Sequence, residues 1–299
     1  MERRVFIAVL LSFAVLYTYQ ALMRRFSTPP SPVTQARKTL PPAQRPEKQT
    51  QEKVEQPLTS AGIPAPSALV ADSEEQNILV ENDVIRVTFS NRGAQVRSWI
   101  LKRYNGVNGR PLDLVPDKLP ADAPRPFSIK TDSEQTNARI ERALFKPSAT
   151  RLDLTSTSGT LTFDYTDSSG LEVQKEFAFS PGSYLVQVNV SVVDSQGAVN
   201  PTIQWGPGIG EIASDKSQYV QEPQGVVCRD GSVVRVAGSK SAVFEEKLEC
   251  AGIEDHYFLS AVLPGGQVAK AEFQPYVLET GSTSKPLVAY RVRVAGGSK

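Results

Sequence analysis

His256 is the first residue to consider for catalysis, because it is the only histidine among the 299 residues. It directly follows Asp255, and an Asp beside a His suggests general acid–base chemistry. Adjacent residues of a strand point to opposite faces, however, so Asp255 cannot readily orient this imidazole. No nucleophile motif accompanies the pair in the sequence. We therefore expect His256 to be a structural or interface residue, and we assign no catalytic residue.

The two cysteines, Cys228 and Cys250, are 22 positions apart. In an exported domain, a disulfide between them would stabilise the fold by about 3 kcal/mol. Two buried free thiols are the alternative, and the spacing does not decide between the two. A zinc site would need further His or Cys ligands nearby, so we expect neither a bound metal nor a cofactor.

Three glycines, Gly206, Gly208 and Gly210, superficially suggest a phosphate-binding loop. Their spacing fits neither a P-loop nor a dinucleotide fingerprint, and no helical pattern follows them. A tight turn leaving a strand is the better interpretation. Trp99 and Trp205 could line a ligand cleft, but aromatic residues at strand positions are more commonly part of the core.

The charge balance argues against a nucleic-acid partner. The chain has 33 Lys and Arg against 32 Asp and Glu, a formal net charge of +1, and a pI near 7.7. Such a chain has no overall basic field to attract phosphates. Its hydrophobic content of 40% is that of an ordinary globular protein.

The N-terminal segment is long enough to cross a bilayer. Residues 5–23 carry no charge, and arginine pairs flank them on both sides. As a helix they would span roughly 28 Å, close to the hydrocarbon thickness. A cleaved signal peptide is the alternative, but the apolar run is long and no small-x-small cleavage site closes it. We expect residues 1–23 to be an uncleaved, single-pass anchor that contacts the lipid bilayer through residues 5–23.

Residues 24–75 have the composition of a disordered linker. They hold nine of the 22 prolines and a single aromatic residue. Such a segment cannot bury enough apolar surface to offset its ordering entropy. We expect it to hold the following domain away from the membrane.

From residue 76 onwards, alternation of apolar and polar residues predicts a mostly β domain over residues 76–299. The clearest strand is 183–193, and 257–263 is apolar on both faces, as expected of a central, buried strand. The further strands predicted are 83–89, 94–101, 138–145, 152–155, 160–166, 171–179, 233–237, 267–273 and 287–294. The best helical candidate is 244–250. A single large β-sandwich accounts for this pattern.

Five segments, in this order, carry a resemblance to a known family. They are VENDVIRVTFSNRGAQVRSWILKRY (80–104), PLDLV (111–115), KEFAF (175–179), GSY (182–184) and GIEDHYF (252–258). Together with the anchor and linker, they make the chain similar to the N-terminal part of YidC, the family of bacterial membrane-protein insertases. The resemblance extends over essentially the whole chain.

This resemblance implies a β-super-sandwich akin to the galactose-mutarotase fold, located in the periplasm and anchored in the inner membrane. It also implies contacts with the Sec translocon, with its SecDF accessory and with nascent membrane proteins. In the family, five further transmembrane helices follow and form the insertase groove. The sequence has no second apolar run of that kind, so we expect no insertase groove within residues 1–299.

Two functions are weighed at this point. The first is a non-enzymatic part of a membrane insertase and chaperone, with the β-domain as a docking and spacing module. The second is a membrane-anchored, carbohydrate-binding or mutarotase-like protein. A mutarotase needs an acid and a base facing one sugar ring, and a single histidine argues against that chemistry.

Overall fold

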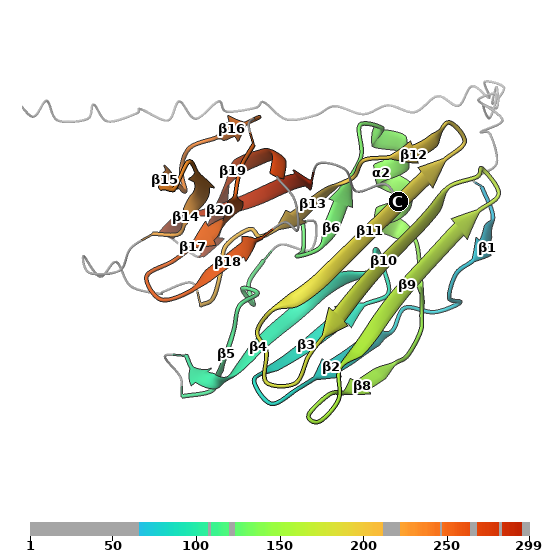
Figure 1. The fold of residues 1–299 in the computed structure, drawn as a ribbon, viewed down its shortest axis with the longest axis horizontal. Helices are drawn as coiled ribbons and strands as arrows, with labels where there is room; N and C mark the ends of the chain where they lie inside the picture. Colours follow the sequence, from blue (N-terminus) through green and yellow to red (C-terminus); the bar gives the residue numbers. More distant parts are fainter. Residues whose placement is uncertain are drawn as a thin grey trace, which may run out of the picture. The chain divides into compact units, whose positions relative to one another are not determined.

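The computed structural model describes residues 66–106, 109–119, 123–211, 222–245, 247–263, 268–280 and 283–294. They lie in one compact unit, Ile63–Lys299, which is mostly β-structure (Figure 1). The predicted anchor and most of the predicted linker lie outside the described residues. No helix in the described ranges is long and apolar enough to cross a membrane.

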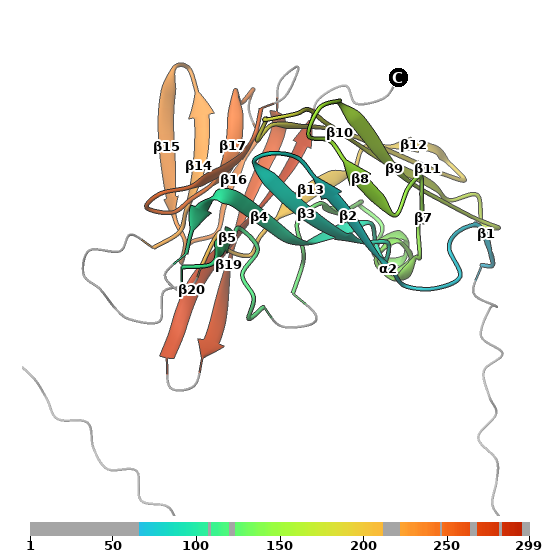
Figure 2. The same ribbon diagram turned by 90° about the horizontal axis from the view of Figure 1, so that it is seen from below.

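Two sheets form a sandwich in the first part of the domain, and Figure 2 shows them as two layers. Sheet A has the order β1 (Ala68–Val70), β9 (Gly159–Asp167), β10 (Glu172–Phe179), β11 (Val186–Asp194) and β12 (Gly197–Val199), with β7 (Lys146–Pro147) also paired to β9. Sheet B has the order β5 (Pro111–Asp113), β4 (Gln95–Asn105), β3 (Ile85–Ser90), β2 (Asn77–Glu81) and β8 (Arg151–Asp153).

Phenylalanines fill the space between sheets A and B. The ring of Phe89 on β3 lies 4.8 Å from that of Phe177 on β10 and 5.5 Å from that of Phe163 on β9. All three are fully buried, because strict alternation along each strand turns every second side chain inward. Each buried ring contributes about 2–3 kcal/mol through the apolar surface it removes from water.

Two further sheets complete the domain. Sheet C has the order β16 (Ala242–Phe244), β19 (Val268–Thr280), β20 (Thr283–Val294), β13 (Thr202–Trp205) and β6 (Ser128–Lys130). Sheet D has the order β15 (Ser232–Ala237), β14 (Gln224–Arg229), β17 (Cys250–Glu254) and β18 (Leu259–Val262). Strand β17 packs on β19 and β20 of sheet C.

Most of the strands expected from alternation are present. The expected strands at 83–89, 94–101, 160–166 and 171–179 correspond to β3, β4, β9 and β10, and the expected strand at 183–193 corresponds to β11. The mostly β prediction is therefore confirmed. Residues 66–75, predicted as the end of the linker, are described and include β1, which pairs with β9.

Two predictions of local structure are wrong. The segment predicted as a strand at 138–145 belongs largely to the helix α2 (Glu134–Arg142). Ser133 caps the start of this helix, since its side chain accepts a hydrogen bond from the Thr136 backbone N–H. Its only large buried apolar residue is Ile140, so no helical stripe is visible in the sequence. The helical candidate 244–250 instead leads from the end of β16 to the start of β17.

The prediction of a buried central strand at 257–263 is also wrong. The segment forms β18, which lies at the edge of sheet D and pairs only with β17 among the described strands. Tyr257, Leu259 and Leu263 are exposed. An apolar run reports a preference for burial, whereas sheet order depends on long-range pairing that a single sequence does not encode.

Candidate interaction surface

A cluster of exposed aromatic side chains gathers where three separate segments meet. We call Tyr104, Tyr184, Tyr257 and Phe258 the aromatic patch. Tyr104 is the last residue but one of β4, Tyr184 lies between β10 and β11, and the other two lie between β17 and β18. Ring centroids are 6.3 Å apart for Tyr104–Tyr184, 5.5 Å for Tyr104–Phe258 and 6.4 Å for Tyr257–Phe258. The chain of ring contacts is therefore continuous.

The patch is open to solvent. Tyr104 is 47% exposed, Tyr184 is 41% exposed and Tyr257 is 81% exposed, whereas Phe258 is partly buried against the core. Exposed aromatic side chains that cluster in this way make the patch a candidate interaction surface. Tyrosine suits this role because its ring offers apolar area and its hydroxyl a hydrogen bond.

A tight turn at Asp255 presents two of these side chains. The Asp255 carboxylate accepts hydrogen bonds from the backbone N–H groups of Tyr257 and Phe258, both at 2.7 Å. The Asp255 backbone N–H also donates to the Phe258 carbonyl at 2.9 Å. One carboxylate oxygen of Asp255 thus holds its own turn, while the exposed His256 ring contacts the Tyr257 ring edge-on, with centroids 4.6 Å apart.

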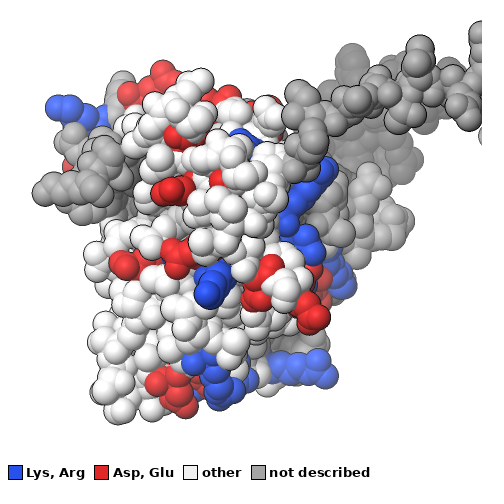
Figure 3. Space-filling view, turned by 90° about the vertical axis from the view of Figure 1, so that its right-hand side faces the viewer, with Lys and Arg blue, Asp and Glu red and all other residues white. Residues whose placement is uncertain are grey.

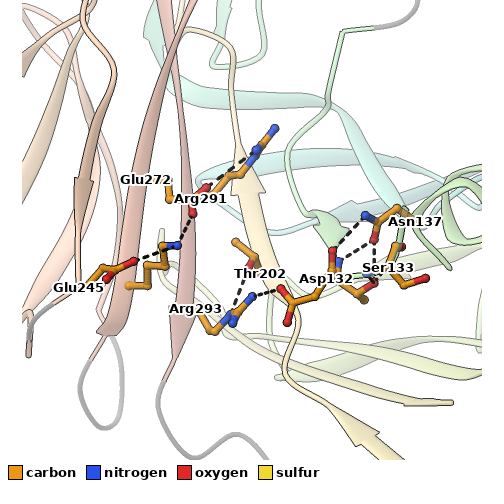
Figure 4. A network of polar contacts seen from close by, with 10 residues as sticks. Asp132, Ser133, Asn137, Thr202, Glu245, Glu272, Arg291 and Arg293 are labelled. Atoms are coloured by element: carbon orange, nitrogen blue, oxygen red, sulfur yellow. Dashed lines mark hydrogen bonds and ion pairs between the residues drawn. The ribbon is translucent and has the colours of Figure 1, made fainter. Parts of the chain in front are cut away.

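Charged side chains form a second candidate, a polar ladder across sheet C (Figure 4). Lys270 on β19 bonds Glu272 at 2.8 Å and Glu245 at 3.2 Å. On the neighbouring strand, Arg291 bonds the Gln204 amide oxygen at 2.6 Å. Hydrogen bonds from Lys270 to Glu272 and Glu245 raise the pKa of this lysine. Because these charges are already paired with one another, we interpret the ladder as a set of cross-strand contacts that stabilise the sheet and not as a binding site.

The ladder continues towards α2. Arg293 on β20 donates to the Asp132 carboxylate at 2.8 Å, and Figure 4 shows this pair beside the cluster of Ser133 and Asn137 at the start of the helix. Acidic and basic side chains are also interspersed on the face shown in Figure 3. This mixture is consistent with the near-zero net charge of the chain.

A buried lysine lies at the centre of the sandwich. The Lys175 ammonium donates to the carbonyls of Gly93 at 2.7 Å, Ala94 at 3.1 Å and Phe127 at 2.8 Å. Burial lowers the pKa of Lys175 to about 7. Ala94 and Phe127 both have positive φ angles, +46° and +63°, which cost strain in residues other than glycine. The hydrogen bonds of Lys175 therefore hold two strained turns, near residues 94 and 127.

The other residues singled out from the sequence have structural positions. Trp99 and Trp205 are buried, with ring centroids 5.6 Å apart. Gly206 has φ +100°, and a Cβ atom there would lie 2.8 Å from the backbone of β20, so the glycines serve a tight turn. Cys228 and Cys250 form a disulfide between directly paired positions of β14 and β17, which resolves the question left open by the sequence.

No group of three or more His, Cys, Asp or Glu side chains in the described ranges is arranged to hold a metal ion. The aromatic patch escaped the sequence interpretation because its members come from positions as far apart as 104 and 258. Only the apolar run at 257–263 gave a signal, and we assigned it to the core.

Comparisons with known proteins give a consistent result. The model of the YidC periplasmic domain family matches residues 77–299. The membrane protein insertase YidC of Syntrophus aciditrophicus is 26% identical over 280 residues, which cover 88% of this chain and 51% of that protein. The Pelobacter propionicus protein of the same name is 25% identical over 283 residues, covering 92% of this chain and 50% of that protein. The chain thus spans about half the length of these relatives.

The solved structures that resemble this chain are more distant. One is the structure of HI1317, with a TM-score of 0.48, 10% identity and coverage of 78% of this chain and 94% of that chain. Another is a galactose mutarotase related enzyme from Lactobacillus acidophilus, with a TM-score of 0.40, 11% identity and coverage of 72% and 84%. The domain is mostly β and has galactose-mutarotase-like structural neighbours. Because the family model covers residues 77–299, this chain belongs to the YidC family and carries its periplasmic domain.

Proposed function

We propose that this chain is the N-terminal portion of a YidC-type membrane protein insertase and chaperone, and that its β-domain is a docking and spacing module. The observation that carries the proposal is the match of residues 77–299 to the YidC periplasmic domain. The aromatic patch supports the docking role, because contiguous exposed rings mark interaction sites.

The proposed partners are those of the family resemblance. They are the bilayer through residues 5–23, the Sec translocon, SecDF and nascent membrane proteins. The proposed location is the bacterial inner membrane, with residues 76–299 in the periplasm after the anchor (1–23) and the linker (24–75). The disulfide between Cys228 and Cys250 supports an oxidising compartment.

A non-enzymatic role fits the site chemistry better than sugar chemistry. The Asp255 carboxylate is engaged by backbone N–H groups, so it does not serve His256 as a partner in proton transfer. An open pocket of about 150 Å³ is lined by apolar side chains such as Leu119, Ala123 and Leu287. Such a lining gives the hydroxyl groups of a sugar few hydrogen-bond partners.

Co-purification from bacterial membranes tests the docking role. The tagged 299-residue chain is expressed and solubilised in mild detergent, alongside a matched control of residues 1–75 that keeps the anchor and linker only. We expect Sec components to co-purify with the 299-residue chain and not with the control. Equal recovery with both chains would contradict a docking role for the β-domain.

Protease accessibility tests the topology. Protease added to intact spheroplasts should digest residues 76–299, because the proposal places them outside the cytoplasm. Digestion that occurs only after the spheroplasts are lysed would place the domain in the cytoplasm and reverse the assignment.

A further inference from the structure

Strand β18 leaves backbone hydrogen-bonding groups free at the edge of sheet D. Asp255 and Phe258 form a hydrogen-bonded pair at the start of the hairpin. Along two antiparallel strands, hydrogen-bonded residue pairs alternate with pairs that are not hydrogen-bonded. Counting from the Asp255–Phe258 pair, Ser260 is hydrogen-bonded to β17, whereas the N–H and C=O groups of Leu259 and Ala261 point away from β17. Among the described residues, no strand pairs with this side of β18.

Close packing at Gly252 agrees with this assignment. A Cβ atom at Gly252 would lie 2.7 Å from the Cα atom of its partner Ala261. Non-hydrogen-bonded pairs of an antiparallel ladder have the shorter separation, so the backbone groups of Ala261 face outward. The edge can therefore accept another strand.

The side chains along this edge carry no charge. Leu259 is 57% exposed and Leu263 is 67% exposed, and β18 contains neither proline nor a charged residue. Two other edge strands in the described part of the chain carry charges that discourage pairing, since β15 has Arg235 and β8 has Arg151 and Asp153. The three-residue edge strands β1, β12 and β16 are uncharged, as β18 is. The β18 edge also lacks charged protection, and it differs from those three edges because Phe258 of the aromatic patch directly precedes it.

The edge is continuous with the aromatic patch. Phe258 directly precedes β18, and its ring contacts those of Tyr104 and Tyr257. A segment that pairs with β18 would therefore meet exposed leucines along the strand and exposed rings at its start. The exposed leucines and the exposed rings both favour a partner with apolar side chains.

We propose that the β18 edge and the aromatic patch bind an extended, uncharged, apolar segment of a membrane-protein client by strand addition. The proposal rests on the function proposed above. The free N–H and C=O groups can pair only with the backbone of an extended segment. The uncharged side chains disfavour a charged partner, because its charges would lose their water on binding without gaining a counter-ion.

The chain's own linker is a poor occupant of this edge. Residues 24–75 contain nine prolines, which lack the N–H group that a ladder needs. A second copy of the chain and a lipid surface are the other candidates, and the experiment separates both from a client segment.

Binding of a defined peptide tests the proposal. The probe is a fluorescent, end-capped peptide of ten alternating valine and threonine residues, and the 299-residue chain is held in phosphatidylcholine nanodiscs. We expect Leu259→Lys and Ala261→Pro each to weaken binding about tenfold or more, because they place a charge on the edge or remove an outward N–H group.

A matched control lies on the opposite edge of the same sheet. Val233 on β15 is 52% exposed, so Val233→Lys adds the same charge to the same sheet and should leave binding unchanged. A peptide N-methylated at every residue should bind at least about tenfold more weakly, because it cannot donate to the edge. Circular dichroism of each variant checks that the fold is retained.

Besides an absence of peptide binding, four outcomes would overturn the proposal. The first is that Leu259→Lys and Val233→Lys weaken peptide binding equally, and the second is that the N-methylated peptide binds as tightly as the unmodified one. The third is that the peptide binds empty nanodiscs equally well. The fourth is that the wild-type chain forms dimers that Leu259→Lys dissociates. Equal binding to empty nanodiscs would assign the peptide signal to lipid, and such dimers would assign the edge to a second copy. If the peptide does not bind but Sec components still co-purify, strand addition at β18 is refuted and the proposed function stands. If the peptide binds but Sec components do not co-purify, the proposed docking function is refuted.

Discussion

Lys175→Met is the most informative single substitution, because it removes a buried ammonium while keeping much of the apolar stem. In the wild type, the group donates to three backbone carbonyls. An uncharged amine has two N–H groups, so it serves at most two of these carbonyls, and methionine removes both donors. Each acceptor left unsatisfied in this way costs about 1.5 kcal/mol. The substitution should therefore destabilise the domain by about 3 kcal/mol where the wild-type lysine is uncharged.

The effect should depend on pH with a defined sign. Burial lowers the pKa of Lys175 from 10.5 to about 7, so between these values the unfolded chain binds a proton that the folded chain does not. The wild type consequently gains stability as pH rises through this window, by up to about 1.4 kcal/mol per pH unit. From pH 7 to pH 9 the gain is about 2 kcal/mol, and Lys175→Met lacks it.

Urea unfolding at both pH values measures this difference. We expect Lys175→Met to cost about 1 kcal/mol at pH 7 and about 3 kcal/mol at pH 9. Lys270→Met is the matched control. Because the pKa of Lys270 is raised, this lysine stays protonated between pH 7 and pH 9 in the folded and the unfolded chain. The unfolding free energy of Lys270→Met should therefore rise with pH as steeply as that of the wild type. A cost of Lys175→Met that does not change with pH would refute the reasoning. It would show that the three carbonyls keep the lysine charged in the folded state.

Three further predictions concern the fold. Replacing Cys228 and Cys250 with serine should lower the unfolding free energy by about 3 kcal/mol, as expected for a loop of this length, and reductant should then have no further effect on that variant; a wild type insensitive to reductant would contradict this. Gly206→Ala should lower the melting temperature more than Gly231→Ala does. Both glycines have positive φ, but only at Gly206 would a Cβ atom lie 2.8 Å from the backbone of another strand. Equal decreases in melting temperature would show that β20 shifts easily to make room. Asp255→Ala should cost about 1–2 kcal/mol in urea unfolding, because two backbone N–H groups lose their acceptor, whereas an unchanged midpoint would mean that water replaces it.

Local alternation predicts the strands because burial on one face repeats every second residue. Strand β10 shows this well: Val173 and Phe177 face the core while Glu172 and Gln174 face solvent. Lys175 breaks the pattern, since it occupies a core position. Its three acceptors come from the turns near residues 93 and 127, so their convergence on one ammonium depends on tertiary structure.

The helix α2 and the aromatic patch were missed for related reasons. In α2, burial falls on the polar residues Thr136 and Asn137 as well as on Ile140, so hydropathy gives no helical period. Ser133 was available as a helix-start signal, and its side chain does cap the helix. Apart from the apolar run at 257–263, the aromatic patch has no local signal, because it joins segments next to β4, β10 and β17, which lie in three different sheets.

The failed prediction at 257–263 bears on the strength of the proposed client binding. Covering an exposed leucine or tyrosine of this segment would contribute at most about 1.5–3 kcal/mol, so Tyr257, Leu259 and Leu263 together supply roughly 5–9 kcal/mol. Association itself costs an estimated 4–15 kcal/mol, and a few added backbone hydrogen bonds contribute about 1 kcal/mol each. The net binding is therefore weak. A weak, uncharged edge releases its partner quickly, which is what a chaperone-like site needs if the segment is to pass on into the membrane.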